Sequence, residues 1–170
     1  PEIYENSEIG RETRVKVGKT LSDGLKREWL SMNMHLGNRY LDSPVCIYDP
    51  HESREDADKD YAEPIHYKPS TRVGARAPHV WLSDGSSILD FFGREFVLVR
   101  LNTELNVEPL IEAAHNHRMP LRTVDITESA AVALYEQALV LVRPDGHVAW
   151  RGHALPQDVT SLVLTITGCR

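Results

Sequence analysis

Residues 96–126 read FVLVRLNTELNVEPLIEAAHNHRMPLRTVDI, and three patterns follow one another in this stretch. Residues 96–101 form an apolar run of the kind expected for a strand covered on both faces. Residues 107–117 place apolar side chains at helical spacing, and residues 121–126 read as a second strand. A strand, a helix and a strand in this order predict two parallel strands joined by a right-handed crossover.

The alternation of helices and strands continues downstream of this unit. The sequence predicts a helix at 130–138, a strand at 139–142, a strand at 147–150, and a helix that begins after Asp158 and ends at Gly168. A Pro-Asp-Gly turn at 144–146 joins the last two strands as an antiparallel hairpin. The order β-α-β-α-β-β-α predicts an α/β fold with a thioredoxin-like mixed sheet flanked by helices.

The sequence upstream of this fold predicts one hairpin close to it. Residues 79–82 and 87–89 flank Asp84-Gly85, a dipeptide typical of hairpin turns. Further upstream, residues 11–17 alternate weakly, which predicts a short strand or an extended arm, and residues 40–48 predict a strand interrupted by Pro44.

A single helix is predicted between these two N-terminal strands. It is expected to begin at a cap within residues 20–23 and to end at Gly37. Its apolar stripe consists of Leu25, Trp29, Met32 and Leu36. One helix and two short strands cannot bury a core of their own, so this part is expected to pack onto something else.

Between the two parts lies an acidic run at 49–63, with seven acids against two bases. Such a composition cannot bury enough apolar surface to offset its ordering entropy. The predicted organisation is therefore a partial N-terminal segment at 1–48, an acidic linker at 49–70 and the thioredoxin-like domain at 71–170.

The composition limits the class of protein and its partners. With 170 residues and 41% hydrophobic content, the chain can bury a core without metals or disulfides. A net charge of −6 without a basic stripe argues against a nucleic-acid partner, and no apolar run approaches the length of a membrane span. Cys46 and Cys169 stand far apart without a CxxC motif, which favours a reducing, cytoplasmic location.

No catalytic, cofactor or metal motif emerges from the residues. Thiol chemistry on a thioredoxin-like fold needs a cysteine after the first central strand, and residues 102–106 read NTELN. The glycines form neither a dinucleotide loop nor a P-loop, no GxSxG elbow is present, and the eight histidines lack metal-ligand spacing. We therefore predict no catalytic residue, no bound cofactor and no metal in this chain.

Two segments carry more charged and aromatic residues than a turn requires, namely RVGARAPH (72–79) and RPDGHVAWRG (143–152). They read either as a rigid loop with an ordinary hairpin or as a docking surface, since arginine, histidine and tryptophan are favoured at interfaces. The candidate contact residues are Arg76, His79, Arg143, Trp150 and Arg151.

These segments also carry a family resemblance. GARAPHVWL (74–82), DGSSILDFFG (84–93), LY (134–135) and LVLVRPDGHVAWRG (139–152) resemble the C-terminal region of FAD-dependent aromatic-ring monooxygenases, in particular the phenol hydroxylase and 2,4-dichlorophenol hydroxylase group. The resemblance implies a thioredoxin-like tail without redox cysteines. It also makes residues 1–48, with the predicted helix and the strand at 40–48, a remnant of the family's flavin and substrate body. It also implies that FAD and NAD(P)H bind a catalytic body whose motifs have no counterpart in this sequence.

Three functions compete on this basis. The leading hypothesis is a non-catalytic C-terminal portion of such a hydroxylase, with structural and dimerisation roles and with the catalytic body or a second copy as partner. A freestanding thioredoxin-like binding module without redox activity is the alternative. An independent redox enzyme is the third, and it requires a reactive thiol that the sequence does not place in position.

Overall fold

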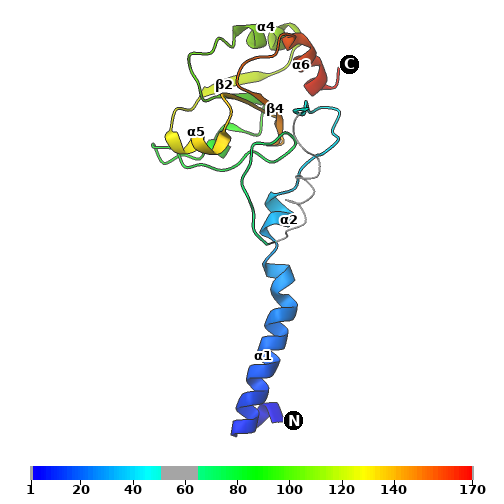
Figure 1. Ribbon diagram of the computed structural model, residues 1–170, viewed down its shortest axis with the longest axis vertical. Coiled ribbons are helices and arrows are strands. Elements are labelled where there is room, and N and C mark those ends of the chain that lie inside the picture. The colour runs from blue at the N-terminus through cyan, green and yellow to red at the C-terminus, as the bar shows by residue number, and fades with distance from the viewer. Residues whose placement is uncertain (1, 51–64, 170) are drawn as a thin grey trace.

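The computed structural model describes residues 2–50 and 65–169, and its centre is a four-stranded sheet of order β2-β1-β3-β4 (Figure 1). The strands are β1 (Phe96–Arg100), β2 (Leu121–Asp125), β3 (Leu139–Val142) and β4 (Val148–Gly152). β1 pairs parallel with β2 and antiparallel with β3, and β3 pairs antiparallel with β4. The helices of this part are α4 (Glu108–Asn116), α5 (Ser129–Tyr135) and α6 (Val159–Thr167). Their order along the chain confirms the thioredoxin-like α/β fold.

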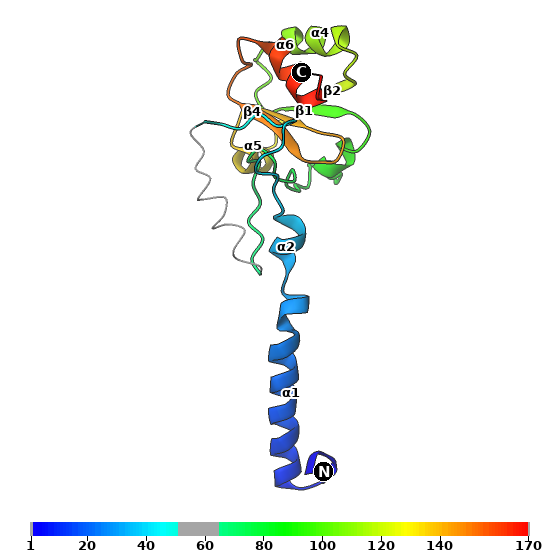
Figure 2. The ribbon, with the colours of Figure 1, turned by 90° about the vertical axis from the view of Figure 1, so that its right-hand side faces the viewer.

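The sheet is covered on both faces, as the apolar run of β1 predicts. Leu98, Leu141 and Trp150 belong to a buried cluster that includes residues of α4 and α6. Val97 and Val99 belong to a second cluster, shared with α5 and the short 3-10 helix η2 (Ile88–Phe91). Figure 2 shows α4 and α6 beyond the sheet and α5 on the side from which α1 projects. We call the sheet and its covering segments, residues 65–169, the head.

The outer edge of β4 is closed by earlier parts of the chain. The backbone N–H of Gly74 donates to the Val148 carbonyl at 2.8 Å, and the N–H of Val148 donates to Ala75 at 2.9 Å. Further along β4, the N–H of Ile47 donates to the Ala149 carbonyl at 2.8 Å. An open strand edge is a template for unwanted pairing, and these contacts remove it at β4.

The N-terminal part differs from its prediction. Residues 11–17, expected as a strand or arm, lie within the helix α1 (Glu8–Trp29), which projects away from the head (Figures 1 and 2). The helix begins at Ser7, whose hydroxyl accepts a hydrogen bond from the Gly10 N–H at 3.1 Å, and not within residues 20–23. Arg, Lys and Glu are strong helix formers, and this preference outweighs a weak alternation in a segment that has no strand to pair with.

Other local predictions also needed correction. The helix expected to reach Gly37 breaks after Trp29, and a separate helix α2 (Met32–Leu36) follows. Residues 40–48 form no strand; they run irregularly along the head. Residues 87–89 give one isolated bridge, Trp81 to Ser87, and then enter η2 because Ser87 and Asp90 form a capping box.

The turn at Asp84-Gly85 is present, and the N–H of Leu82 donates to the Ser86 carbonyl at 2.9 Å. Most of the predicted acidic linker, residues 51–64, lies outside the described residues. None of the helices in the described part combines the length and the apolar character needed to cross a membrane.

Candidate functional site

The carboxyl ends of β1 and β2 are the place where a thioredoxin-like fold would carry its thiols. Here Arg100, the last residue of β1, forms two hydrogen bonds of 2.7 Å with the carboxylate of Asp125, the last residue of β2. A third bond of 3.2 Å joins Arg100 to the carbonyl of Leu105. Cys46 is buried elsewhere, against the Val148 carbonyl, and Cys169 is exposed after α6. Neither thiol reaches this end of the sheet.

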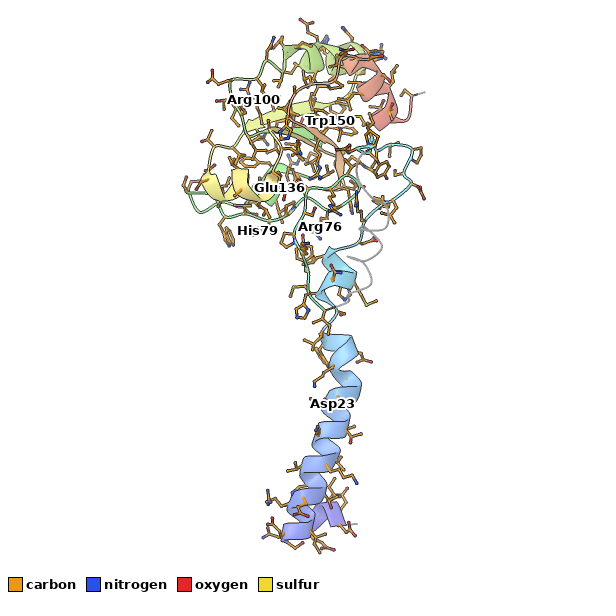
Figure 3. The ribbon with its side chains drawn as sticks, in the orientation of Figure 1. Asp23, Arg76, His79, Arg100, Glu136 and Trp150 are labelled. Carbon is orange, nitrogen blue, oxygen red and sulfur yellow. The ribbon has the colours of Figure 1, made fainter. Side chains whose placement is uncertain are left out.

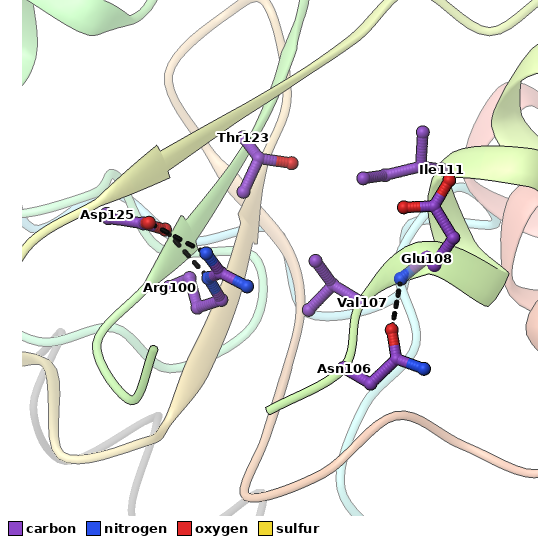
Figure 4. Close-up of a pocket in the computed structure, with 7 residues that line it drawn as sticks. All are labelled: Arg100, Asn106, Val107, Glu108, Ile111, Thr123 and Asp125. Atoms are coloured by element: carbon purple, nitrogen blue, oxygen red, sulfur yellow. Dashed lines mark hydrogen bonds and ion pairs between the residues drawn. The ribbon is translucent and has the colours of Figure 1, made fainter. Parts of the chain in front are cut away.

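An open pocket of about 380 Å³ lies between the Arg100–Asp125 pair and the start of α4 (Figure 4). It is lined by Arg100, Asn106, Val107, Glu108, Ile111, Thr123 and Asp125. The guanidinium of Arg100 holds the pKa of Asp125 below its usual range, so both groups are charged at neutral pH.

This pocket does not fit FAD, the cofactor that the resemblance implies for the parent protein. A dinucleotide is held by a glycine-rich loop whose backbone N–H groups face the diphosphate at a helix N-terminus. The loop at 102–106 contains no glycine, and the side chain of Asn106 already accepts the Glu108 N–H at 3.0 Å.

A second surface lies where residues 74–77 pair with residues 146–148, and we call this pair of segments the ribbon. Arg76 faces His147 across an isolated bridge, and the Ala77 N–H donates to Gly146 at 2.9 Å. A cavity of about 170 Å³ beside the ribbon is lined by Arg76, Leu89, Phe92, Gly93, Pro144, Asp145 and Gly146. The ribbon therefore brings together the two segments, 72–79 and 143–152, that the sequence singled out.

Arg143 is held beside the ribbon by several partners. Its guanidinium pairs with Asp145 at 2.8 Å and lies 5.6 Å from the ring centre of Tyr40. The Tyr40 ring in turn lies 4.8 Å from the ring of His147. Tyr40 thus ties the N-terminal segment to the hairpin, a contact that the sequence did not predict.

Arg76 and His79 are exposed, and Figure 3 shows both on the side of the head from which α1 projects. The ring of His79 packs edge-on against Trp81 at 4.6 Å, and Trp81 is 68% exposed. Sequence reasoning missed Trp81 as a surface residue. The signal was present, because Val80 and Leu82, its neighbours in an extended segment, are the buried ones.

Trp150 and Arg151 lie deeper than the other candidates. Trp150 is 7% exposed and packs in the cluster under α6. Arg151 donates to the Thr71 hydroxyl at 3.1 Å and lies 3.6 Å from the Glu136 carboxylate. Both side chains make internal contacts in this chain, and their role as docking residues stays a prediction.

The residues described by the structure contain no group of three His, Cys, Asp or Glu side chains placed to hold a metal ion. The structure thus offers two candidate surfaces: the Arg100–Asp125 ion pair with its pocket at one end of the sheet, and the ribbon with Arg76 and Arg143 nearer α1.

Comparison with known proteins agrees with the resemblance. Residues 70–168 match the family model described as the C-terminal part of aromatic-ring hydroxylases. The FAD-dependent monooxygenase apdD of Emericella nidulans is 34% identical over 157 residues, which are 88% of this chain and 24% of that protein. Phenol 2-monooxygenase of a Pseudomonas species is 29% identical and matches 97% of this chain and 29% of its own length.

Solved structures extend the similarity to the N-terminal part. A RebC variant, solved in native and K252c-bound form, superposes with a TM-score of 0.83 at 37% identity, covering 100% of this chain and 31% of its own. The flavin-dependent monooxygenase PieE, solved with FAD and substrate, gives a TM-score of 0.62 at 26% identity over 97% of this chain. The chain thus spans less than a third of the length of these relatives.

Proposed function

Because this chain belongs to the aromatic-ring hydroxylase C-terminal family, we propose that it serves as the non-catalytic C-terminal portion of an FAD-dependent aromatic hydroxylase. In this proposal FAD, NAD(P)H and the phenolic substrate bind the catalytic body of the parent protein. The chain contributes a folded head and a helix, α1, that docks onto that body.

The exposed apolar stripe of α1 carries this proposal. Val17, Leu21, Leu25 and Trp29 are spaced by four residues, so they share one side of the helix. Leu21 is 59% exposed and Trp29 is 79% exposed. A soluble domain rarely leaves such a stripe uncovered, and relatives three to four times longer than this chain offer a body to cover it.

The predicted contact residues support the same arrangement. Arg76 and His79 lie on the α1 side of the head, where a body packed along α1 would also meet them (Figure 3). We infer that Arg143, which lies beside the ribbon, contacts the same body as Arg76 and His79. In this arrangement Trp150 and Arg151 support the surface from within, because their internal contacts hold β4 in place. A second arrangement to test is a homodimer, in which the α1 stripes of two copies pack against each other.

The free thiols of Cys46 and Cys169 favour a cytoplasmic location, where cysteines stay reduced.

A flavin titration of the purified 170-residue chain tests the non-catalytic role. We expect no saturable quenching of FAD fluorescence into the high micromolar range and no oxidation of NAD(P)H in the presence of phenols. Saturable binding, or turnover near 1 per second, which is in the usual range of enzymes, would contradict the proposal.

Docking is tested by supplying the chain in trans to the remainder of the parent hydroxylase. We expect co-purification that is lost with Leu21→Gln/Leu25→Gln and retained with Lys16→Gln/Lys19→Gln, a matched pair of changes outside the stripe. Equal capture of both variants would mean that α1 is not the docking element.

A further inference from the structure

Within residues 2–50 and 65–169, the outer edge of β2 has no paired strand. The N–H of Phe96 bonds the Pro120 carbonyl and the N–H of Ile126 bonds the Arg100 carbonyl, both at 3.0 Å. In a parallel ladder with this register, Arg122 and Val124 direct their backbone groups to β1. The backbone N–H and C=O groups of Leu121, Thr123 and Asp125 therefore point outward, and no segment among residues 2–50 and 65–169 bonds them.

The pocket between the Arg100–Asp125 pair and the start of α4 lies directly beside this edge. Thr123 and Asp125 point to the sheet face that α4 covers, and they form one wall of the pocket. Glu108 and Ile111 of α4 form the opposite wall (Figure 4). A strand added to β2 would turn every second side chain to this face of the sheet, and the one beside Thr123 and Asp125 would lie next to the pocket.

The charges of the pocket select the kind of side chain that it accepts. Arg100 is engaged by Asp125 and by the Leu105 carbonyl. The carboxylate of Glu108 is exposed, and in the described part of the chain it has no ion-pair partner. Both oxygens of Asp125 accept hydrogen bonds from Arg100, so Glu108 supplies the negative charge that the pocket offers to a ligand. The apolar surface of Ile111 can cover the aliphatic stem of a long cationic side chain.

We propose that the β2 edge and the pocket between Asp125 and Glu108 form a docking site for an extended polypeptide segment that carries a lysine or arginine. The segment adds to the sheet through backbone hydrogen bonds to Thr123 and Asp125. Its cationic side chain enters the pocket and meets the Glu108 carboxylate.

A partner fits this edge better than a second copy of the chain does. Antiparallel pairing of two β2 edges around a twofold axis would bring the Glu108–Asp125 patches of both copies to the same face of the sheet. Like charges would then oppose each other, whereas a basic segment is complementary. The site does not depend on the proposed docking of α1, because Arg100 lies toward the end of the head remote from α1 (Figure 3).

The test is an NMR titration of the full 170-residue chain with two probe peptides, acetyl-TVKVT-amide and acetyl-TVEVT-amide. We expect saturable shifts at the amides of Leu121, Thr123, Asp125 and Glu108 with the lysine peptide. Binding of the glutamate peptide should be at least about tenfold weaker. An absence of shifts along β2, equal binding of the two peptides, or concentration-dependent β2 shifts without peptide would each overturn the proposal.

Two variants separate the backbone and charge contributions. Glu108→Gln should weaken binding of the lysine peptide by about two- to fivefold. Glu112→Gln, one turn further along α4 and outside the pocket lining, should leave the binding unchanged. Thr123→Pro removes an outward N–H that β1 does not use and should abolish binding of the peptide. If Thr123→Pro perturbs the fold, the Glu108 and Glu112 pair decides the question alone.

Discussion

Gly74 belongs to the segment that covers the edge of β4, and its backbone adopts a conformation that other residues rarely adopt. It has φ +85°, and a β-carbon at this position would collide with the carbonyl oxygen of Tyr40. Gly85 has φ +82° but faces open space. Both glycines therefore have a left-handed backbone that would strain any other residue, but only Gly74 is also in close contact with another segment.

We expect Gly85→Ala to lower the free energy of unfolding by about 1–2 kcal/mol, the cost of a left-handed alanine. Gly74→Ala should lower it by about 3 kcal/mol or more, because the Tyr40 segment must also move. Urea unfolding of both variants measures the difference. Equal losses would mean that the Tyr40 segment can move away from the added β-carbon at no cost in stability.

Tyr135 is fully buried in the core, and its hydroxyl donates to the Pro78 carbonyl at 2.9 Å. Tyr135→Phe leaves that carbonyl without a donor and should cost about 1–2 kcal/mol. Tyr4→Phe is the control, since Tyr4 is largely exposed and its replacement should change the unfolding midpoint very little.

The same residue makes stability depend on alkaline pH. Burial raises the pKa of Tyr135 above its ordinary value of 10, so the folded chain keeps the proton that the unfolded chain loses. The stabilisation is complete below pH 10 and falls as pH rises beyond it. Between pH 9 and pH 11 the wild type should therefore lose stability more steeply than Tyr135→Phe, and parallel curves would contradict this assignment.

At the scale of elements, α1 has a consequence for the isolated chain. Its apolar stripe should drive self-association at tens of micromolar or above, because exposed apolar patches seek cover. Leu21→Gln/Leu25→Gln should shift sedimentation velocity profiles to the monomer, while Lys16→Gln/Lys19→Gln should not. The melting temperature of the head should be the same in both variants, and a monomeric wild type would show that the stripe is not adhesive.

The elements that were predictable from sequence are those whose local signals agree with their packing. β1, β3, α4 and α6 combine a clear apolar period with flanking turns or caps, and each lies where expected. α1 was missed in part because its ends are set by Ser7 and by a break after Trp29, while its exposed stripe gives no packing to mark its limits.

The candidate sites were predictable to different degrees. Segments 72–79 and 143–152 stand out by composition, and the ribbon joins them. The pocket did not stand out, since Arg100 and Asp125 are 25 positions apart and meet only through the parallel register of β1 and β2. Such a pair becomes visible only when the strand pairing is known.

At the scale of the whole molecule, the extent of the head can be tested by truncation. Removal of residues 1–30 should leave the melting temperature within about 2 °C, because α1 packs against η1 (Glu2–Tyr4) and projects from the head. Removal of residues 1–48 should lower it by about 10 °C or more, since Cys46 and Ile47 pack into the two core clusters. Equal melting temperatures would instead support the predicted domain start at residue 71.

The closure of the β4 edge by residues from so early in the chain also has a kinetic meaning. Cys46 and Val148 are 102 positions apart, and the contacts between their neighbourhoods close a loop that spans most of the head. Closing long loops is entropically unfavourable before other contacts form, and non-local pairings slow folding. During synthesis, the 39–48 segment must wait until β4 has been made. The head should therefore refold slowly for its size, with the β4 edge exposed to mispairing until the earlier segment settles against it.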